Sequence, residues 1–275
     1  MAKRRRGKGE RGIRRSIRDG RGQGRGADYN PWLHIQDVPS RGLVTRVKGW
    51  KTGRVHHLLS LLELWYFYVL EWSQAVTDIR EQYPLLPLEE TLDIARRLGV
   101  HHPTDPITKE PVVMTTDFVL TVRRGCSEVD QARTVKYEKD LLSKRVLEKL
   151  EIERRYWESH SVDWKIVTEK QIPVVLAKNV QWFHQYRVLE DFATVSAAEA
   201  EQIISVLTLS VGACVASPLR SITLQTDDRL GLEPGTSLSL VRHLFACRRW
   251  RIDMRMPINP YERLVMADGW AQEGC

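Results

Sequence analysis

The chain has 275 residues, which is long enough for two domains of ordinary size, each with its own hydrophobic core. Hydrophobic residues make up 42% and charged residues 28%, and no apolar run reaches the length of a membrane span, which argues against a membrane protein. The four cysteines, Cys126, Cys214, Cys247 and Cys275, lie far apart in sequence and indicate neither a disulfide framework nor a zinc ribbon. These features favour a protein of the reducing cytoplasm.

A basic segment opens the chain. Residues 1–26 hold eleven Lys and Arg against Glu10 and Asp19, a balance of +9, whereas the rest of the chain carries about −2. Because the segment has almost no large apolar side chains, we expect residues 1–27 to be a disordered tail, and neither a secretory signal nor a membrane anchor. Dense arginine favours binding to nucleic-acid phosphates, with a merely solubilising tail as the alternative. The candidate DNA-binding residues are Arg4, Arg5, Arg6, Arg14, Arg15, Arg21 and Arg25.

The sequence pattern of residues 28–173 predicts an α/β domain in which a mixed sheet is flanked by helices. Periodicity and turn residues predict its elements in chain order: a buried helix at 56–72, a strand ending at Pro84, a helix at 88–98, a hairpin of strands at 112–122 and 132–139, a helix at 141–159 and a strand at 163–172. On the helix at 141–159, one side is apolar and is expected to cover the sheet. Its members are Leu142, Val146, Leu147, Leu150 and Trp157.

Residues 174–275 predict a mostly helical, winged-helix-like domain. Ser196 with Glu199 forms a capping-box pattern at the start of one helix. A helix at 236–250 runs into residues 251–258, where apolar and charged residues alternate as in a strand. The basic residues of this helix could enter a DNA groove or form a protein-docking face, and the sequence leaves both open. They are Arg242, Arg248 and Arg249.

Two carboxylates interrupt apolar segments of the first domain. Glu63 stands in SLLELWYFYVLEW, where its neighbours at helical spacing include Leu59, Phe67 and Leu70. Asp117 stands in VVMTTDFVLTV, the predicted first strand of the hairpin. Burying an unpartnered carboxylate costs several kcal/mol, so we expect a cation, a metal ion or a water-filled cleft beside these residues.

A lysine on the returning strand completes a possible active site. Thr134 and Lys136 are two residues apart and share a strand face, which the hairpin could place beside Asp117. Two carboxylates that hold Mg²⁺, with a lysine that orients the nucleophile, suit metal-assisted phosphodiester hydrolysis. The alternative is structural: Glu63 and Lys136 would form a buried ion pair, and Asp117 would bond to backbone amides. Spacing alone leaves both open.

Several motifs together resemble the TnsA endonuclease family. They are GRGQG, PWL, KTGRVHHLLS before Glu63, DIREQYPLLP, TTDF with Asp117, VK with Lys136, and EKLEIERRYW. The resemblance implies a restriction-endonuclease-like catalytic domain at 28–173 and a winged-helix-like domain at 174–275. It further implies Mg²⁺-dependent cleavage of the 5′ strands at transposon ends during cut-and-paste transposition, together with a TnsB transposase and a TnsC ATPase.

Site residues and cofactor follow from the same resemblance. Glu63, Asp117 and Lys136 match the catalytic positions of the family, with one or two Mg²⁺ ions held by the two acids. At the position of a family glutamine this chain has Thr134, whose hydroxyl could reach an ion through water. This departure keeps open an alternative, a catalytically weak DNA-binding adaptor of the transposition complex. The implied location is the bacterial cytoplasm, at the nucleoid during the reaction.

The motif DIREQ at residues 78–82 is not assigned a role by the resemblance. Arg80 and Gln82 share one strand face, and Glu81 lies on the other. These residues could contact a DNA phosphate or form buried salt bridges with neighbouring acids, and both remain open. By resemblance, the C-terminal domain meets the TnsC partner, which favours protein docking for the helix at 236–250.

Overall fold

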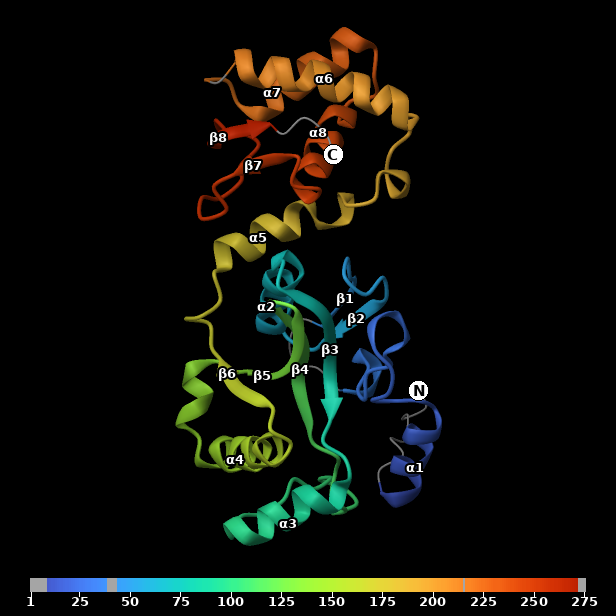
Figure 1. Cartoon of the computed structure of the whole chain (residues 1–275), viewed down its shortest axis with the longest axis vertical. Coiled ribbons are helices and arrows are strands. Elements are labelled where there is room, and N and C mark those ends of the chain that lie inside the picture. Colours follow the sequence, from blue (N-terminus) through green and yellow to red (C-terminus); the bar gives the residue numbers. More distant parts are fainter. Residues whose placement is uncertain (1–8, 39–43, 215, 272–275) are drawn as a thin grey trace. The chain divides into compact units, whose positions relative to one another are not determined.

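The computed structural model describes residues 9–38, 44–214 and 216–271, and it divides the chain into two compact units, Met1–Ile172 and Pro173–Cys275 (Figure 1). The division falls beside the domain boundary that the sequence predicts. Within the described ranges, no helix has the length and apolar character needed to cross a membrane.

The N-terminal unit is built on a mixed four-stranded sheet in the order β3-β4-β5-β6 (Figure 1). Strands β3 (Val76–Pro84), β4 (Thr115–Arg124) and β5 (Ser127–Val135) pair antiparallel in succession, and β6 (Asp163–Val167) pairs parallel to β5. A separate antiparallel pair consists of β1 (Thr45–Lys48) and β2 (Val55–Leu58). This mixed sheet confirms the α/β class.

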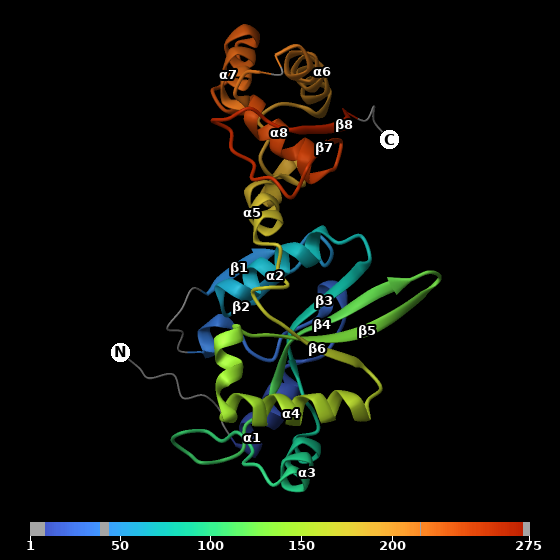
Figure 2. The same cartoon turned by 90° about the vertical axis from the view of Figure 1, so that its left-hand side faces the viewer.

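Helices cover both faces of the sheet. Figure 2 shows α2 (Leu61–Trp72) on one side of the sheet and α4 (Lys144–Ser159) on the other. The adjacent residues Phe118 and Val119 of β4 are both buried, although side chains alternate along a strand. Phe118 packs edge-on against Tyr66 of α2, and Val119 packs with the α4 side of the core. The sheet is therefore buried on both faces.

Several predicted elements are confirmed, and others begin or end elsewhere. Strand β3 ends at Pro84 and α3 spans Leu88–Leu98, as predicted. The helix predicted at 56–72 begins only after Ser60, whose side chain accepts the Glu63 N–H and caps α2. The helix predicted at 141–159 begins at Lys144. Leu142, placed on its apolar side, instead ends a 3₁₀ turn and is 87% exposed.

The N-terminal segment differs from the disordered tail that we expected. Helix α1 spans Glu10–Arg18, and the residues after it pack against β3, one of the two edge strands of the sheet. Tyr29 Oη donates to the Glu81 carbonyl at 3.1 Å, and Trp32 N–H donates to the Gln82 carbonyl at 3.2 Å. The expectation of disorder is therefore wrong for residues 9–27, because buried aromatic side chains that follow them anchor the segment to an otherwise unpaired strand edge.

The C-terminal unit is mostly helical. Its elements are α5 (Val174–Phe183), α6 (Ala197–Ala213), α7 (Leu219–Leu230), α8 (Thr236–Ala246), β7 (Trp250–Ile252) and β8 (Met266–Ala271), where β7 and β8 pair antiparallel. The capping box of Ser196 and Glu199 is confirmed at the start of α6. Short 3₁₀ turns complete both units: Gly26–Asp28, Ile35–Asp37, Glu138–Leu142, His184–Tyr186 and Leu189–Asp191.

Strand β7 is shorter than the alternation in residues 251–258 predicts. It ends at Ile252, and the following backbone bonds to a side chain from α5. Asn179 Nδ2 donates to the carbonyls of Met254 and Met256, and its Oδ1 accepts the Ile258 N–H at 2.9 Å. A buried amide thus satisfies backbone groups that a longer strand would have paired.

Candidate active site

Glu63 lies in the first turn of α2 and is only 7% exposed. Ser60 Oγ donates to Glu63 Oε1 at 2.9 Å, and the Leu59 N–H donates to Oε2 at 3.0 Å. The helix N-terminus therefore supplies the hydrogen-bond donors that hold this carboxylate, and its dipole favours negative charge there. The fixed Glu63 carboxylate faces the sheet from the helix that covers it.

Asp117 and Lys136 contact each other directly. Asp117 Oδ2 accepts the Val135 N–H at 2.7 Å and Lys136 Nζ at 2.9 Å. Lys136 lies one residue beyond β5, where its own N–H donates to the Val167 carbonyl at the end of β6. The structural alternative of a Glu63–Lys136 ion pair is therefore replaced by an Asp117–Lys136 pair, although Asp117 does accept one backbone amide.

The charges of Glu63, Asp117 and Lys136 act on one another. Burial, with the negative charge of Asp117 as the second cause, raises the pKa of Glu63 to about 7. Burial acts to lower the pKa of Lys136, but attraction to Asp117 outweighs it, and the lysine pKa is raised. Lys136 is therefore protonated and offsets part of the negative charge of Asp117 and Glu63.

Glu153 is a third buried acid that the sequence reasoning missed. It projects from α4 and accepts hydrogen bonds from Thr116 Oγ1 at 2.6 Å and from Trp164 Nε1 at 3.1 Å. Burial raises the pKa of Glu153 to about 7, with the charge of Asp117 as a further cause. Its spacing from Leu150 and Trp157 on one helix face was the signal that could have identified it.

Thr134 has a different partner from the one we expected. Its hydroxyl donates to Glu153 and accepts Trp164 Nε1 at 3.1 Å. The side chain therefore supports the third acid, and its role as a metal ligand stays a prediction.

The donor set suits a hard divalent cation. In the described parts of the chain, no three or more His, Cys, Asp or Glu side chains form a ready metal cluster. Glu63 and Asp117 nevertheless offer carboxylate oxygens, the ligands that Mg²⁺ prefers, and Mg²⁺ commonly binds through one or two carboxylates with water completing its shell. Burial and the negative charge of Asp117 both raise the pKa of Glu63, and a bound cation would act against both effects.

The DIREQ segment forms buried salt bridges, which confirms one of the two alternatives. Arg80 pairs with Asp130 at 2.7 Å and with Asp78 at 3.3 Å. On the other strand face, Glu81 pairs with Arg54 and His56. The last residue of the motif reaches the candidate site, because Gln82 Nε2 donates to Glu63 Oε2 at 3.2 Å.

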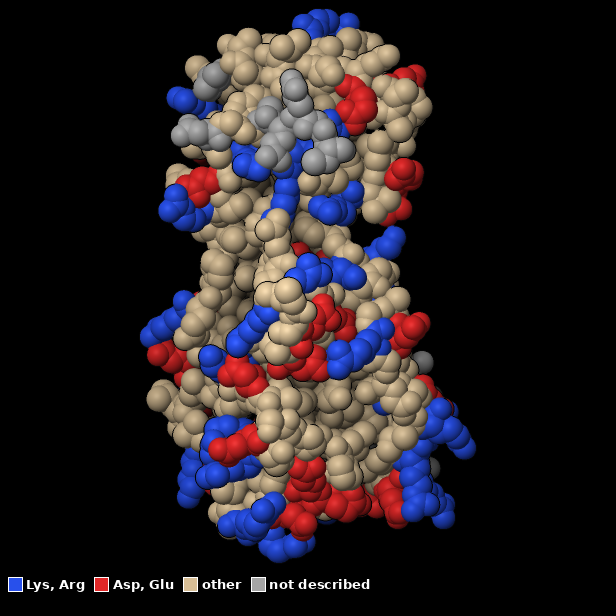
Figure 3. All heavy atoms as spheres, in the orientation of Figure 1, with Lys and Arg blue, Asp and Glu red and all other residues tan. Residues whose placement is uncertain are grey.

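The tail arginines have mixed surroundings. Arg4, Arg5 and Arg6 lie outside the described residues, and Arg14 and Arg15 are exposed and pair with Glu10 and Asp19 of their own segment. Arg21 pairs with Asp37 at 2.6 Å and Arg25 with Asp130 at 2.9 Å, so both help to hold the segment in place. On the face shown in Figure 3, basic and acidic side chains of this unit are interspersed. DNA binding by these arginines stays a prediction.

The basic residues of α8 and its C-terminal end make contacts within their own unit. The Arg242 guanidinium lies over the rings of Trp182 at 4.5 Å and Tyr186 at 4.9 Å. Arg249 forms two hydrogen bonds with Glu201, at 2.6 and 2.8 Å. Arg248 is partly buried and has a left-handed backbone, with φ of 60°. Arg242 and Arg249 thus stabilise the unit, and partner docking stays a prediction.

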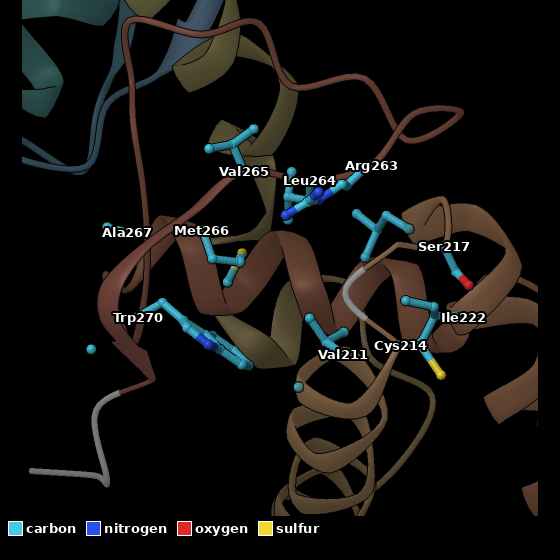
Figure 4. A pocket seen from close by; sticks show the side chains of 13 residues that line it. Val211, Cys214, Ser217, Ile222, Arg263, Leu264, Val265, Met266, Ala267 and Trp270 are labelled. Carbon is cyan, nitrogen blue, oxygen red and sulfur yellow. The ribbon is translucent and has the colours of Figure 1, made fainter.

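A cavity of about 310 Å³ lies in the C-terminal unit. Figure 4 shows Val211 of α6, Ile222 of α7, and Met266 and Trp270 of β8 around it. Among the described side chains that line it there is no carboxylate. The cavity is therefore chemically different from the acidic site of the N-terminal unit.

Comparisons with known proteins identify the family of this chain. Residues 73–169 match the model described as TnsA-like endonuclease N terminal, and residues 171–254 match TnsA endonuclease C terminal. The chain is 41% identical over 234 residues to the transposon Tn7 transposition protein TnsA of Escherichia coli, over 85% of this chain and 82% of that protein. The chain therefore belongs to the TnsA family of transposition endonucleases.

Proposed function

We propose that this chain cleaves the 5′ strands at transposon ends in a Mg²⁺-dependent reaction, within a complex that contains a TnsB-like transposase and a TnsC-like ATPase. The observation that carries the proposal is the 2.9 Å contact of Lys136 with Asp117, with Glu63 close enough for Asp117 to raise its pKa. Two acids and one lysine, each from a different element, converge in a unit whose family is an endonuclease family.

The arrangement of elements supports a restriction-endonuclease-like catalytic domain. One acid comes from a helix on the sheet, the second from the central strand β4, and the lysine from the end of the neighbouring strand β5. In the C-terminal unit, helices α6, α7 and α8, followed by the paired strands β7 and β8, support a winged-helix-like domain. We infer both fold assignments from these topologies.

Glu63 and Asp117 would hold one or two Mg²⁺ ions. Such an ion, when bound, polarises the scissile phosphate and makes a water molecule more acidic. Lys136, kept protonated by Asp117, would orient the attacking water and offset negative charge that develops on the phosphate. Ser60 and the Leu59 N–H hold the Glu63 carboxylate still, so that no reorganisation is needed during the reaction.

The exposed arginines Arg14 and Arg15 would add a sequence-independent attraction to transposon-end DNA. End recognition would then fall largely to the partner proteins. From the bacterial relative we infer that the protein works in the cytoplasm, at the nucleoid.

One departure favours a second candidate function, a catalytically weak DNA-binding adaptor. Thr134 replaces the glutamine that the family resemblance leads us to expect, and its hydroxyl serves Glu153. An adaptor would keep the fold and the partners but not the cleavage.

Strand-resolved cleavage separates the two candidates. A transposon-end DNA is incubated with Mg²⁺, the TnsB-like and TnsC-like partners, and either this chain or its Asp117→Ala variant. We expect the variant to lose only the 5′ cuts while 3′ cutting and joining persist. Unchanged 5′ cutting would show that the acids are structural, and absence of 5′ cutting by both chains would favour the adaptor.

A further inference from the structure

Gln82 has an unusual backbone for a residue inside a strand. It lies in β3 with φ of 50°, in the left-handed region that residues other than glycine rarely adopt. The residue is 2% exposed, so solvent does not account for the conformation. Strained backbone of this kind persists only where surrounding contacts enforce it, and it concentrates at functional sites.

Contacts on both sides enforce this conformation. Glu81 pairs with Phe118 and Tyr83 with Thr116, which places Gln82 at the level of Asp117 in the ladder. On the outer edge, the Trp32 N–H donates to the Gln82 carbonyl at 3.2 Å. The ordered N-terminal segment therefore supplies the bond that the edge strand would otherwise lack.

The amide of Gln82 joins the two elements that carry the acids. Its Nε2 donates to Glu63 Oε2 at 3.2 Å, and its Oε1 accepts Thr115 Oγ1 at 3.3 Å. Thr115 begins β4, two residues before Asp117. The nitrogen side of the amide faces Glu63, which suits an ionised carboxylate because that group only accepts hydrogen bonds. Thr115 then fixes the amide in that orientation.

We infer that Gln82 is a positioning residue, which holds the Glu63 carboxylate at a fixed distance from Asp117 so that the two acids can bind one divalent cation. The left-handed backbone of Gln82 directs its side-chain amide toward Glu63. Hydrogen-bond partners of metal-binding side chains orient those side chains, and their loss typically weakens metal affinity about 10- to 100-fold. The inference rests on the proposed role of Glu63 and Asp117 in holding Mg²⁺.

The test measures Mn²⁺ binding to the full chain by electron paramagnetic resonance, without DNA, alongside thermal unfolding of the metal-free protein. Gln82→Met keeps the length of the side chain but removes the amide. Gln82→Asn keeps an amide and tolerates a left-handed backbone, yet is one carbon too short to reach Glu63. We expect both variants to bind Mn²⁺ roughly tenfold more weakly, with the Asn variant unfolding near the wild-type temperature.

Three further variants make the result specific. Thr115→Val should weaken Mn²⁺ binding about threefold. Thr115→Ser should bind Mn²⁺ as the wild-type chain does, because serine keeps the hydroxyl that orients the Gln82 amide. Thr77→Val removes a hydroxyl contact of β3 with the Thr121 carbonyl and should leave Mn²⁺ binding unchanged.

Asp117→Ala separates failure of this inference from failure of the proposed function. Wild-type Mn²⁺ affinity in Gln82→Met or Gln82→Asn, with binding lost in Asp117→Ala, would overturn the role of Gln82 and leave the metal site standing. Wild-type affinity in Asp117→Ala would instead overturn the proposed metal site.

Discussion

The N-terminal unit buries two groups of charged side chains that differ in how their charges are balanced. Glu81 is fully buried, but Arg54 and His56 both contact it, and despite burial they hold its pKa well below the usual range. In the second group, Lys136 pairs with Asp117, and the charges of Glu63 and Glu153 also act on this lysine. Burial raises the pKa of Glu63 and of Glu153 to about 7.

The difference shows how the same residue type serves stability in one place and chemistry in another. A buried carboxylate with enough cations is a fixed anion that ties elements together, here the β1–β2 pair to β3. Buried carboxylates whose charge is only partly neutralised make the metal-free fold less stable, and a divalent ion that binds them would neutralise the remaining charge. Four predictions test this comparison.

The largest expected effect is on catalysis. Glu63→Gln should lower the rate of 5′-strand cleavage roughly 10³-fold, because the neutral amide cannot hold a divalent cation as a carboxylate does. Strand-resolved cleavage in the reconstituted complex measures it, with 3′ cutting as the internal control. A loss below tenfold would place Glu63 outside the chemistry.

In the group of Glu81, Arg54 and His56, loss of one charge should lower the stability of the fold. Arg54→Met should lower the free energy of unfolding by about 3–5 kcal/mol, because it leaves the Glu81 charge buried with only His56 beside it. Urea denaturation measures the change. The double variant Arg54→Met with Glu81→Gln should lose less than the two single changes added together. Simple additivity would mean that the Arg54–Glu81 pair is not the coupled unit that we describe.

In the group of Glu63, Asp117, Glu153 and Lys136, the raised pKa of a buried acid should make the stability of the fold depend on pH. Glu153 has a higher pKa in the folded state than its ordinary value, so the folded protein binds its proton more tightly and loses stability as pH rises from about 4.5 through about 7. Glu153→Gln should therefore stabilise the metal-free protein at pH 8 by up to about 3 kcal/mol. Near pH 4 the difference should vanish. Urea denaturation at both pH values tests this, and a less stable variant at pH 8 would contradict it.

The smallest expected effect is stabilisation by the ion itself. Mg²⁺ at about ten times its Kd should raise the free energy of unfolding by roughly 1.4 kcal/mol, because only the folded chain brings Glu63 and Asp117 together. Thermal unfolding with MgCl₂, compared with NaCl of equal ionic strength, isolates the effect. Asp117→Ala should abolish it and Arg54→Met should retain it. Equal stabilisation of all three chains would indicate a nonspecific salt effect.

Local features of the sequence predicted much of the fold. Strand β3, helix α3 and the capping box of Ser196 with Glu199 follow from short-range periodicity and capping, which depend on neighbours within a few residues. The acids Glu63 and Asp117 stood out for a similar reason, since a charge inside an apolar segment is costly wherever that segment packs. Residues 9–27 were wrongly expected to be disordered because their composition does not show the strand edge that they meet.

Sequence patterns were thus sufficient to predict the order of the main elements and the burial of Glu63 and Asp117. The packing of the folded chain is what brings Lys136 to Asp117, Thr134 to Glu153, and Gln82 to Glu63. These contacts join residues 19 positions apart in the chain, on separate helices and strands. Their geometry depends on how those elements pack, which local periodicity does not encode.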